Sequence, residues 1–340
     1  MNSLNAASQQ PEDVKLSVVI PVFNEAAVFG QLKRRLVESL LLLPAPTEVL
    51  LVNDGSGDST GALISELCRQ DGRFVGVHLT RNFGHQMAVC AGLELARGEA
   101  VAVMDGDLQD PPEILPAFYA KLREGYDVVY AIRRQRKEIL FKRFMYWAFY
   151  RLMAALTPIE IPLDSGDFGI MSRRVVDALK TMPERRRFVR GMRSYVGFRQ
   201  TGVAYERQER AGGQPKYTFR KLLMLAADGI FTFSEIPLRI ATLVGLFTAG
   251  FSILYGAYLL IERIFIGFNL PGFATLAVGL FFLGGVQLIC LGILGEYIGR
   301  IHQEVKQRPP YIIEHVDRSS VENEPIPAPL VSAPPPDISQ

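Results

Sequence analysis

Cysteine and net charge are both scarce in this chain. Its 340 residues include only three cysteines, and 37 basic residues nearly balance 35 acidic ones, which gives a net charge of +2. Cys68, Cys90 and Cys290 are far apart and lack the spacing of a zinc site, and so small a set is typical of a reducing compartment. A net charge this low provides no basic field for a polyanion, so we expect no nucleic-acid partner.

The chain also lacks an internal repeat and a secretory signal. Met1–Asp13 is polar and has no apolar core of the kind that a signal peptide needs. We expect this segment to be disordered, together with the proline-rich tail, residues 318–340. With 49% hydrophobic residues, the rest of the chain suffices for one sizeable soluble domain together with membrane segments.

Apolar strand patterns alternate with helical patterns over about the first 130 residues. The strand patterns begin at Leu16 and continue with Glu48–Val52, Phe74–Leu79, Ala100–Met104 and Asp127–Tyr130. This alternation predicts an α/β domain with a mostly parallel, doubly wound sheet. Open sheets of this kind bind their ligands at the carboxyl ends of the strands.

Polar and acidic residues follow three of these predicted strands. Asp105-Gly-Asp107-Leu-Gln109-Asp-Pro-Pro follows the fourth strand, and its two carboxylates, one residue apart, reach the same side of the sheet edge. Oxygen ligands of this type suit a hard divalent cation that holds a diphosphate, although a solvated turn would contain the same pair. Asn24-Glu25 and Asn53-Asp54-Gly55 end the first two strands, and three such ends on one edge predict a nucleotide site.

These motifs resemble glycosyltransferase family 2, whose members have the GT-A (Rossmann-like) fold. Within that family they are most similar to polyprenyl-phosphate glycosyltransferases of the dolichyl-phosphate mannose synthase and bacterial undecaprenyl-phosphate glucosyltransferase type, from about Leu16 to Pro310. Arg210-Ala-Gly-Gly-Gln-Pro-Lys216-Tyr217 is similar to the family's Arg-x-x-Gly-x-Ser-Lys-Tyr loop. Pro215 stands at the serine position, so this chain offers no hydroxyl there.

The resemblance implies a role for each candidate site residue. Residues expected around the nucleotide and donor are Pro21, Asn24, Glu25, Asp54, Arg210 and Lys216. Residues expected to hold Mg²⁺ or Mn²⁺ are Asp105, Asp107 and Gln109, and those expected at the acceptor phosphate are Gln109, Arg133 and its neighbour Arg134. Asp167 matches an acidic position beside the reacting sugar, where it would orient a hydroxyl or act as a base; a helix cap or turn residue is the alternative. We expect His85 to be a capping or packing residue at a helix start.

Two long apolar runs near the carboxyl end predict a membrane hairpin. Leu238–Ile261 and Gly272–Leu294 are each long enough to cross a bilayer, and only Glu262–Pro271 joins them, whereas buried core helices are the alternative. Basic residues flank the outer ends of the pair, namely Arg220, Lys221, Arg239, Arg300, Lys306 and Arg308, and the link carries only Arg263. The positive-inside rule therefore predicts that both termini and the sheet domain are cytoplasmic, on a cell (inner) membrane.

The remaining segments complete the expected organisation. Residues 138–156 mix aromatic and basic side chains at helical spacing, which favours a helix lying on the membrane surface over one packed on the sheet. We expect a glycosyltransferase domain over 14–215, a juxtamembrane helix over 216–237, the hairpin over 238–299 and a cytosolic segment over 300–317.

The expected activity is transfer of one sugar, with inversion, from a nucleotide sugar to a polyprenyl phosphate in the bilayer. Likeness to the bacterial branch favours UDP over GDP. A processive polysaccharide synthase would need more spans and a Gln-x-x-Arg-Trp motif, whereas Met145-Tyr146 precedes the only tryptophan, Trp147. A catalytically inactive membrane tether would have lost part of the acidic and basic set. The sugar, and whether the chain is a homo-oligomer, stay open.

Overall fold

The computed structural model describes residues 14–44, 46–134, 165–184, 187–206, 236–266 and 272–319. The chain forms two compact units. One comprises Met1–Glu138, Ile161–Pro215 and Arg308–Gln340, and the other comprises Ile139–Glu160 and Lys216–Gln307. Several predicted features lie outside the described residues: the two terminal segments as far as 13 and from 320, the surface helix at 138–156, the juxtamembrane helix up to residue 235, and the loop with Arg210 and Lys216.

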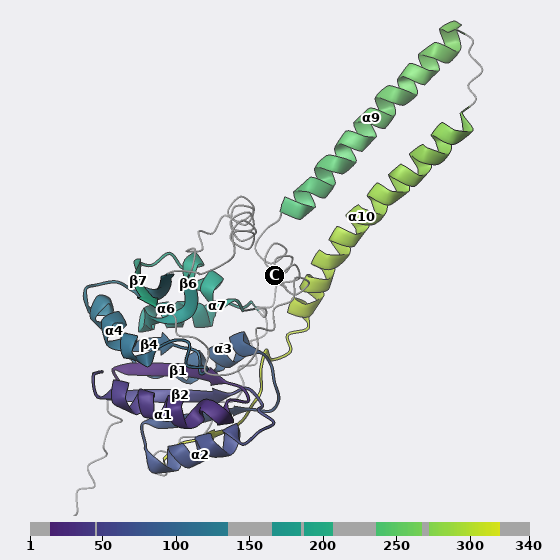
Figure 1. Ribbon diagram of the computed structural model, residues 1–340. Coiled ribbons are helices and arrows are strands. Elements are labelled where there is room, and N and C mark those ends of the chain that lie inside the picture. Colours follow the sequence, from purple (N-terminus) through teal and green to yellow (C-terminus); the bar gives the residue numbers. More distant parts are fainter. Residues whose placement is uncertain are drawn as a thin grey trace, which may run out of the picture. The chain divides into compact units, whose positions relative to one another are not determined.

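One eight-stranded sheet organises the first unit (Figure 1). In sheet order its strands are β7 (Gln200–Glu206), β5 (Val128–Arg134), β6 (Ser165–Ser172), β4 (Ala100–Val103), β1 (Leu16–Val22), β2 (Thr47–Asn53), β3 (Phe74–Leu79) and β8 (Ile313–Asp317). Four neighbouring pairs are parallel, whereas β6 and β8 run antiparallel to their neighbours. The predicted mostly parallel α/β sheet is therefore confirmed.

Helices cover both faces of this sheet because successive strand residues point to opposite sides. Val18 and Ile20 of β1 join the core under α1 (Ala26–Leu40), α2 (Thr60–Gln70) and α4 (Leu115–Arg123), which follows the short 3₁₀ helix η1 (Pro112–Ile114). Val19 joins the opposite core, under α3 (His85–Leu95), α6 (Arg173–Thr181) and α7 (Val189–Tyr195). Both faces are thus buried, as in a doubly wound domain.

Three strands were not expected from the sequence. β6 contains two glycines and little β-branched sequence, so its pattern is weak, and β7 follows a segment without a clear period. β8 lies in the stretch expected to be a separate cytosolic segment, and it pairs antiparallel with β3 as an outer strand. The first unit therefore takes strands from both sides of the hairpin sequence.

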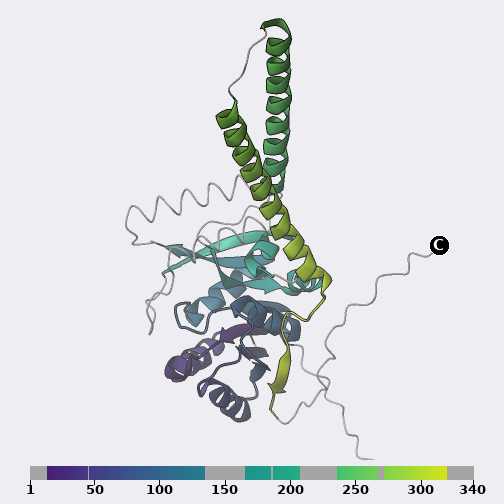
Figure 2. The same ribbon diagram turned by 90° about the vertical axis from the view of Figure 1, so that its right-hand side faces the viewer.

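The second unit contains the two predicted apolar helices, α9 (Ile236–Ile266) and α10 (Phe273–Val305). Figure 2 shows them side by side, and the Cys290 Sγ of α10 lies 3.8 Å from the carbonyl oxygen of Ala241 in α9. Ile236–Glu262 and Val278–Val305 are long and apolar enough to cross a membrane. Many of their large apolar side chains are exposed, as lipid-facing residues would be.

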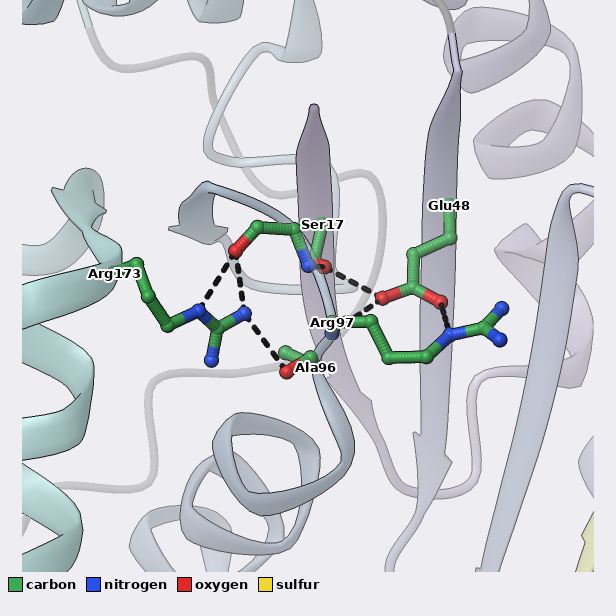
Figure 3. A network of polar contacts seen from close by, with 6 residues as sticks. Ser17, Glu48, Ala96, Arg97 and Arg173 are labelled. Carbon is green, nitrogen blue, oxygen red and sulfur yellow. Dashed lines mark hydrogen bonds and ion pairs between the residues drawn. The ribbon is translucent and has the colours of Figure 1, made fainter. Parts of the chain in front are cut away.

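A buried polar network fixes the amino-terminal end of the sheet (Figure 3). Glu48, only 4% exposed, accepts hydrogen bonds from the Ser17 hydroxyl at 2.6 Å and from the Arg97 backbone N–H at 2.7 Å. The Arg97 Nε lies 3.2 Å from the other carboxylate oxygen, and the Gly98 N–H donates to the Ser17 hydroxyl at 2.7 Å. Arg173 of α6 donates to loop carbonyls, including that of Gly98. The network thereby anchors the loop between α3 and β4, far from the carboxyl ends of the strands.

Candidate active site

The loops after β1 and β2 interlock at the carboxyl edge of the sheet. The Asn24 N–H donates to the Ser56 hydroxyl at 3.0 Å, and the Gly57 N–H donates to the Asn24 Oδ1 at 2.8 Å. The Glu25 N–H donates to the Thr60 hydroxyl at 3.0 Å. Asn24 has a φ of 55°, which is unusual for a residue other than glycine and is typical of functional loops. The two loops expected to surround a nucleotide therefore form one connected surface.

Asp54 uses its carboxylate to hold a third loop in place. It is 3% exposed at the end of β2, and its two oxygens accept the backbone N–H groups of Phe83 at 2.7 Å and Gly84 at 3.0 Å. Burial raises the pKa of Asp54, and these two N–H groups oppose the rise. Asp54 therefore sets the position of the loop that leads into α3 and His85. Its predicted contact with a nucleotide stays a prediction.

The turn that carries Asp105 and Asp107 is packed tightly against β1. A Cβ atom on Gly106 would lie 2.7 Å from the Val22 Cγ1, so only glycine fits there. Leu108 is buried and has a φ of 62°, a strained conformation for a branched residue. Such strain at an acidic turn marks a site whose shape is held by its surroundings.

The acidic turn brings several carboxylates close to Asp105. Burial raises the pKa of Asp105 to about 6, and the carboxylates of Asp110, Asp107 and Asp167 add to the rise while His85 opposes it. A bound divalent cation would relieve this repulsion, and carboxylate oxygens are its preferred ligands. The Gln109 N–H donates to the Asp107 Oδ1 at 3.1 Å, which orders the turn. Asp105 and Asp107 therefore fit a metal ion.

Asp167 reaches this turn from β6. In the antiparallel β4–β6 pair, Val103 lies opposite Gly169, so Asp105, which follows β4, and Asp167 of β6 come from facing ends of the two strands. The His85 Nε2 lies between them, 3.5 Å from the Asp105 Oδ1 and 3.6 Å from the Asp167 Oδ2. The interpretation of Asp167 as a cap or turn residue is wrong, since it is part of a strand.

His85 contacts two of the candidate site carboxylates, so its surroundings are more than those of the capping or packing residue expected at this helix start. It begins α3, whose N-cap is Gly84, and no side-chain cap bond forms there. Burial alone would lower the pKa of His85, but the bond to Asp167 and the charge of Asp105 raise it. Its partners come from other strands, so no neighbour in the sequence could have revealed this position.

A second group of residues surrounds Asp167, and the sequence analysis missed all of them. The Gln86 Nε2 donates to the Asp167 Oδ2 at 2.6 Å, and its Oε1 accepts the Val189 N–H of α7 at 2.9 Å. The Arg190 Nε lies 3.5 Å from the Asp167 Oδ1, and Arg193 is buried nearby. Although burial would raise it, contacts with His85, Arg190 and Gln86 hold the pKa of Asp167 well below its usual range.

The structure gives only part of the surroundings of the remaining predicted site residues. Pro21 is buried in β1, opposite Val52 of β2. Arg133 and Arg134 end β5, where they pair with Tyr205 and Glu206 of β7, but the structure does not describe their side chains. Their predicted contacts with an acceptor phosphate therefore stay predictions, as do those of Arg210 and Lys216.

A histidine pair between β3 and β8 is structural rather than metal-binding. The His78 and His315 rings stack at 4.3 Å with an interplanar angle of 10°, and a metal ion cannot lie in both ring planes at once. The Asn53 Oδ1 accepts the Ser56 N–H at 3.0 Å, so its Nδ2 donates to the His78 Nδ1 at 3.1 Å. The His78 proton is then on Nε2, 3.2 Å from Asp317, and the cluster fastens β8 to β3.

Sequence comparison identifies the family. The profile of glycosyl transferase family 2 matches residues 17–180, which include every strand end described above. The SfII prophage-derived bactoprenol glucosyl transferase of Shigella flexneri is 43% identical over 309 residues, 90% of this chain and 100% of that protein. The chain belongs to glycosyl transferase family 2. The predicted resemblance is therefore confirmed, and the protein is a glycosyltransferase.

Further matches of this family 2 glycosyltransferase extend to the hairpin. Residues 236–301 match the profile described as the GtrB C-terminal hairpin. A prophage bactoprenol glucosyl transferase homolog of Escherichia coli K12 is 41% identical over 307 residues, 90% of this chain and 100% of that protein. Among solved structures, the glucosyl-3-phosphoglycerate synthase of Mycobacterium tuberculosis aligns with a TM-score of 0.45 and 21% identity, over 64% of this chain and 78% of that one.

Proposed function

We propose that this protein transfers one sugar from a nucleotide sugar to a polyprenyl phosphate, with inversion at the anomeric carbon. The observation that carries the proposal is the 43% identity to a bactoprenol glucosyl transferase over 90% of the chain, which includes both the sheet domain and the hairpin. Bactoprenol is a polyprenol, and glucose is therefore the first sugar to test. UDP is the nucleotide we infer for the donor.

The two substrates come from different phases: the polyprenyl phosphate is in the bilayer and the nucleotide sugar is in water. The apolar helices and the sheet domain are suited to these two phases. A polyprenyl tail cannot leave the bilayer, so the enzyme must work at the membrane surface, and α9 and α10 would anchor it there. The nucleotide sugar arrives from water and would bind the loops after β1 and β2, around Asn24 and Glu25. Pro21 and Asp54 would support this surface from the strand ends, and Arg210 and Lys216 would close over the donor.

Asp105 and Asp107, with Gln109, would hold Mg²⁺ or Mn²⁺ at the donor diphosphate. The neighbouring carboxylates of Asp105, Asp107 and Asp110 support this assignment, because a divalent cation would offset their charge; burial, the main cause of the raised pKa of Asp105, leaves little water to do so. When bound, the cation neutralises the charge that grows on the departing nucleoside diphosphate. The strained, tightly packed turn at Gly106 and Leu108 keeps the two carboxylates in a fixed position before substrate arrives.

In the reaction, an acceptor phosphate oxygen forms a bond to the anomeric carbon while the bond from that carbon to the diphosphate oxygen breaks. A phosphate monoester is already anionic near neutral pH, so the enzyme must mainly orient two anions and balance their charge. A carboxylate whose pKa is held low is a weak base, and Asp167 is of that kind. We therefore infer that Asp167 orients its neighbours rather than removing a proton.

The decisive experiment uses the full chain in detergent. It is incubated with UDP-[¹⁴C]glucose, undecaprenyl phosphate and Mg²⁺ or Mn²⁺, and the extracted lipids are analysed by mass spectrometry, with Asp105→Asn as the matched control. One hexose per lipid, lost in the control, is expected, and a β-linked product from the α-linked donor would demonstrate inversion. Water-soluble polymer would indicate a processive synthase. No product from any of a panel of UDP- and GDP-sugars would favour a tether.

We propose further that both termini and the sheet domain are cytoplasmic. Arg239, Arg300, Lys306 and Arg308 flank the outer ends of α9 and α10, whereas Arg263 alone lies near their connection. Fusions after Gln340 test this orientation. A green fluorescent protein should fluoresce there and alkaline phosphatase should be inactive, and the reverse result would contradict the proposed topology.

A further inference from the structure

The short helix α7 carries two arginines to the Asp167 side of the site. Arg190 and Arg193 are three residues apart, so they lie on the same face of the helix. The bridge that Gln86 makes between Asp167 and the Val189 N–H fixes the start of α7 relative to the carboxylate. The backbone that carries these arginines is therefore fixed next to Asp167.

Arg190 and Asp167 face each other with incomplete hydrogen bonding. The Arg190 Nε and the Asp167 Oδ1 are both buried, 3.5 Å apart, and neither has a hydrogen-bond partner within the described part of the chain. The rest of the Arg190 side chain is accessible, with 26% of its surface exposed. The Nε of Arg190 faces a carboxylate, and the exposed part of its side chain is open to a ligand.

Arg193 is too deeply buried to bind an anion. It is 2% exposed, its Nη2 lies 3.4 Å from the Gly166 carbonyl oxygen, and its guanidinium sits over the Tyr130 ring. Burial lowers the pKa of Arg193 to about 10, which still leaves it charged at neutral pH. Arg193 therefore adds positive charge behind Asp167, and Arg190 is the arginine of this pair that can touch a ligand.

The order of the strands indicates which ligand Arg190 meets. From β2 through β1 and β4 to β6, the sheet presents the nucleotide loops, then the Asp105 turn, then Asp167. Along this order the Asp105 turn lies between the loops after β1 and β2 and Asp167, the carboxylate that Arg190 faces. The donor phosphates would share the metal, but an acceptor phosphate on the far side needs a cation from the protein.

We propose that Arg190 binds the phosphate of the polyprenyl-phosphate acceptor, and that Asp167 is the positioning residue that aims its guanidinium. The proposal rests on the acceptor assigned under the proposed function. A guanidinium binds phosphate through two parallel N–H donors, so Arg190 would hold the attacking oxygen's phosphate in one orientation. No proton is transferred by either residue in this role.

The test compares acceptor and donor dependence in the full chain. Arg190→Gln should raise the KM for undecaprenyl phosphate by about tenfold or more, because a charged, bidentate contact is lost. The Kd for UDP-glucose, measured by calorimetry on the same detergent-solubilised protein with Mn²⁺, should stay within about threefold, as expected for a residue outside the donor site. Arg190→Lys keeps the charge without the fork and should recover part of the loss. Arg69→Gln, an exposed arginine on α2, is the control for removing a charge.

Asp167→Asn separates positioning from base catalysis. Asparagine keeps the shape of the side chain but no longer orients the Arg190 guanidinium, so the acceptor KM should rise, as it does in Arg190→Gln. The acceptor KM of the double variant should be no higher than that of Arg190→Gln alone. A fall in kcat with an unchanged acceptor KM would show that Asp167 acts on the chemistry instead. The thermal midpoint of each variant identifies those that fail to fold. If Arg190→Gln does not fold, the acceptor KM of Arg190→Lys tests the role of Arg190 instead.

Three outcomes would overturn the assignment of Arg190. These are an unchanged acceptor KM in Arg190→Gln, an equal or larger loss of UDP-glucose binding, which would place Arg190 on the donor phosphates, and a Lys variant with wild-type kinetics. Wild-type turnover is measured first. A wild-type enzyme that glycosylates no polyprenyl phosphate refutes the proposed function, whereas an active wild type with an unaffected Arg190→Gln refutes only the role of Arg190.

Discussion

Glu48→Leu should destabilise the sheet domain strongly without affecting the carboxyl edge. Glu48 is buried at the amino-terminal end of β2, where it accepts the Ser17 O–H and the Arg97 N–H and pairs with the Arg97 guanidinium. Leucine fills a similar volume but accepts no hydrogen bond. The buried Ser17 hydroxyl and the partly buried Arg97 N–H then lose their acceptor, and the anchor of the loop between α3 and β4 is lost.

The expected magnitude follows from these contacts. Each of these two donors left without a partner costs about 1–3 kcal/mol, so Glu48→Leu should lower the free energy of unfolding by about 2–6 kcal/mol. At about 2–4 °C per kcal/mol for a domain of this size, the midpoint should fall by about 4–24 °C. Glu48→Gln retains one acceptor oxygen and loses only a pair with a partly exposed arginine, about 1 kcal/mol or 2–4 °C.

Two buried cysteines can report the unfolding of the sheet domain. Burial raises the pKa of the Cys68 thiol to about 12 and that of the Cys90 thiol to about 11, so both should react with a fluorogenic maleimide only on unfolding. A Cys290→Ala background removes the cysteine of α10. Equal midpoints for Glu48→Leu and Glu48→Gln, or a Glu48→Leu midpoint within about 2 °C of the parent, would refute the reasoning.

Three other predictions concern separate parts of the sheet domain. Gly106→Ala should lower kcat by about 100-fold because its Cβ would push the acidic turn away from Val22, and activity near that of the parent would contradict the packing argument. Arg174→Met should lower the stability more than Arg69→Met does, since it leaves the buried Asp127 without its bidentate partner; urea titrations of the two variants measure the difference. The Arg174 contact holds the pKa of Asp127 below its unfolded value, so this stabilisation is complete above about pH 4 and should vanish as the pH falls further, whereas a pH-independent difference would count against the pair. A stop codon before β8 should lower the thermal midpoint and increase hydrogen exchange in β3, and unchanged β3 protection would show that β8 adds nothing.

Short-range patterns predicted the elements that the sequence encodes locally. The first four strands are apolar runs, and Asn24, Asp54 and Asp105 follow three of them, so both the sheet and its functional edge could be inferred from local sequence. Those runs are buried on both faces, which is why they contain so little polar sequence.

The rest of the site depends on contacts between distant segments. Asp167 meets Asp105 because β6 is antiparallel to β4 and in a particular register, and nothing in the local pattern of β6 fixes that pairing. His85 and Gln86 look like ordinary residues of a first helical turn until the partner strand is placed. Arg190 was missed for the same reason, since its partner is known only in three dimensions.

Within the described residues, the two outermost strands of the sheet, β7 and β8, are the last strand before the hairpin and the first strand after it. The hairpin is thus an insertion into a discontinuous domain rather than an appended tail. During synthesis, the sheet can be completed only after both apolar helices have left the ribosome. A water-soluble derivative would need a linker across seven strand spacings of about 4.8 Å, about 34 Å in all, or at least about ten residues. Simple truncation would instead leave β3 as an open edge, available for pairing with other chains.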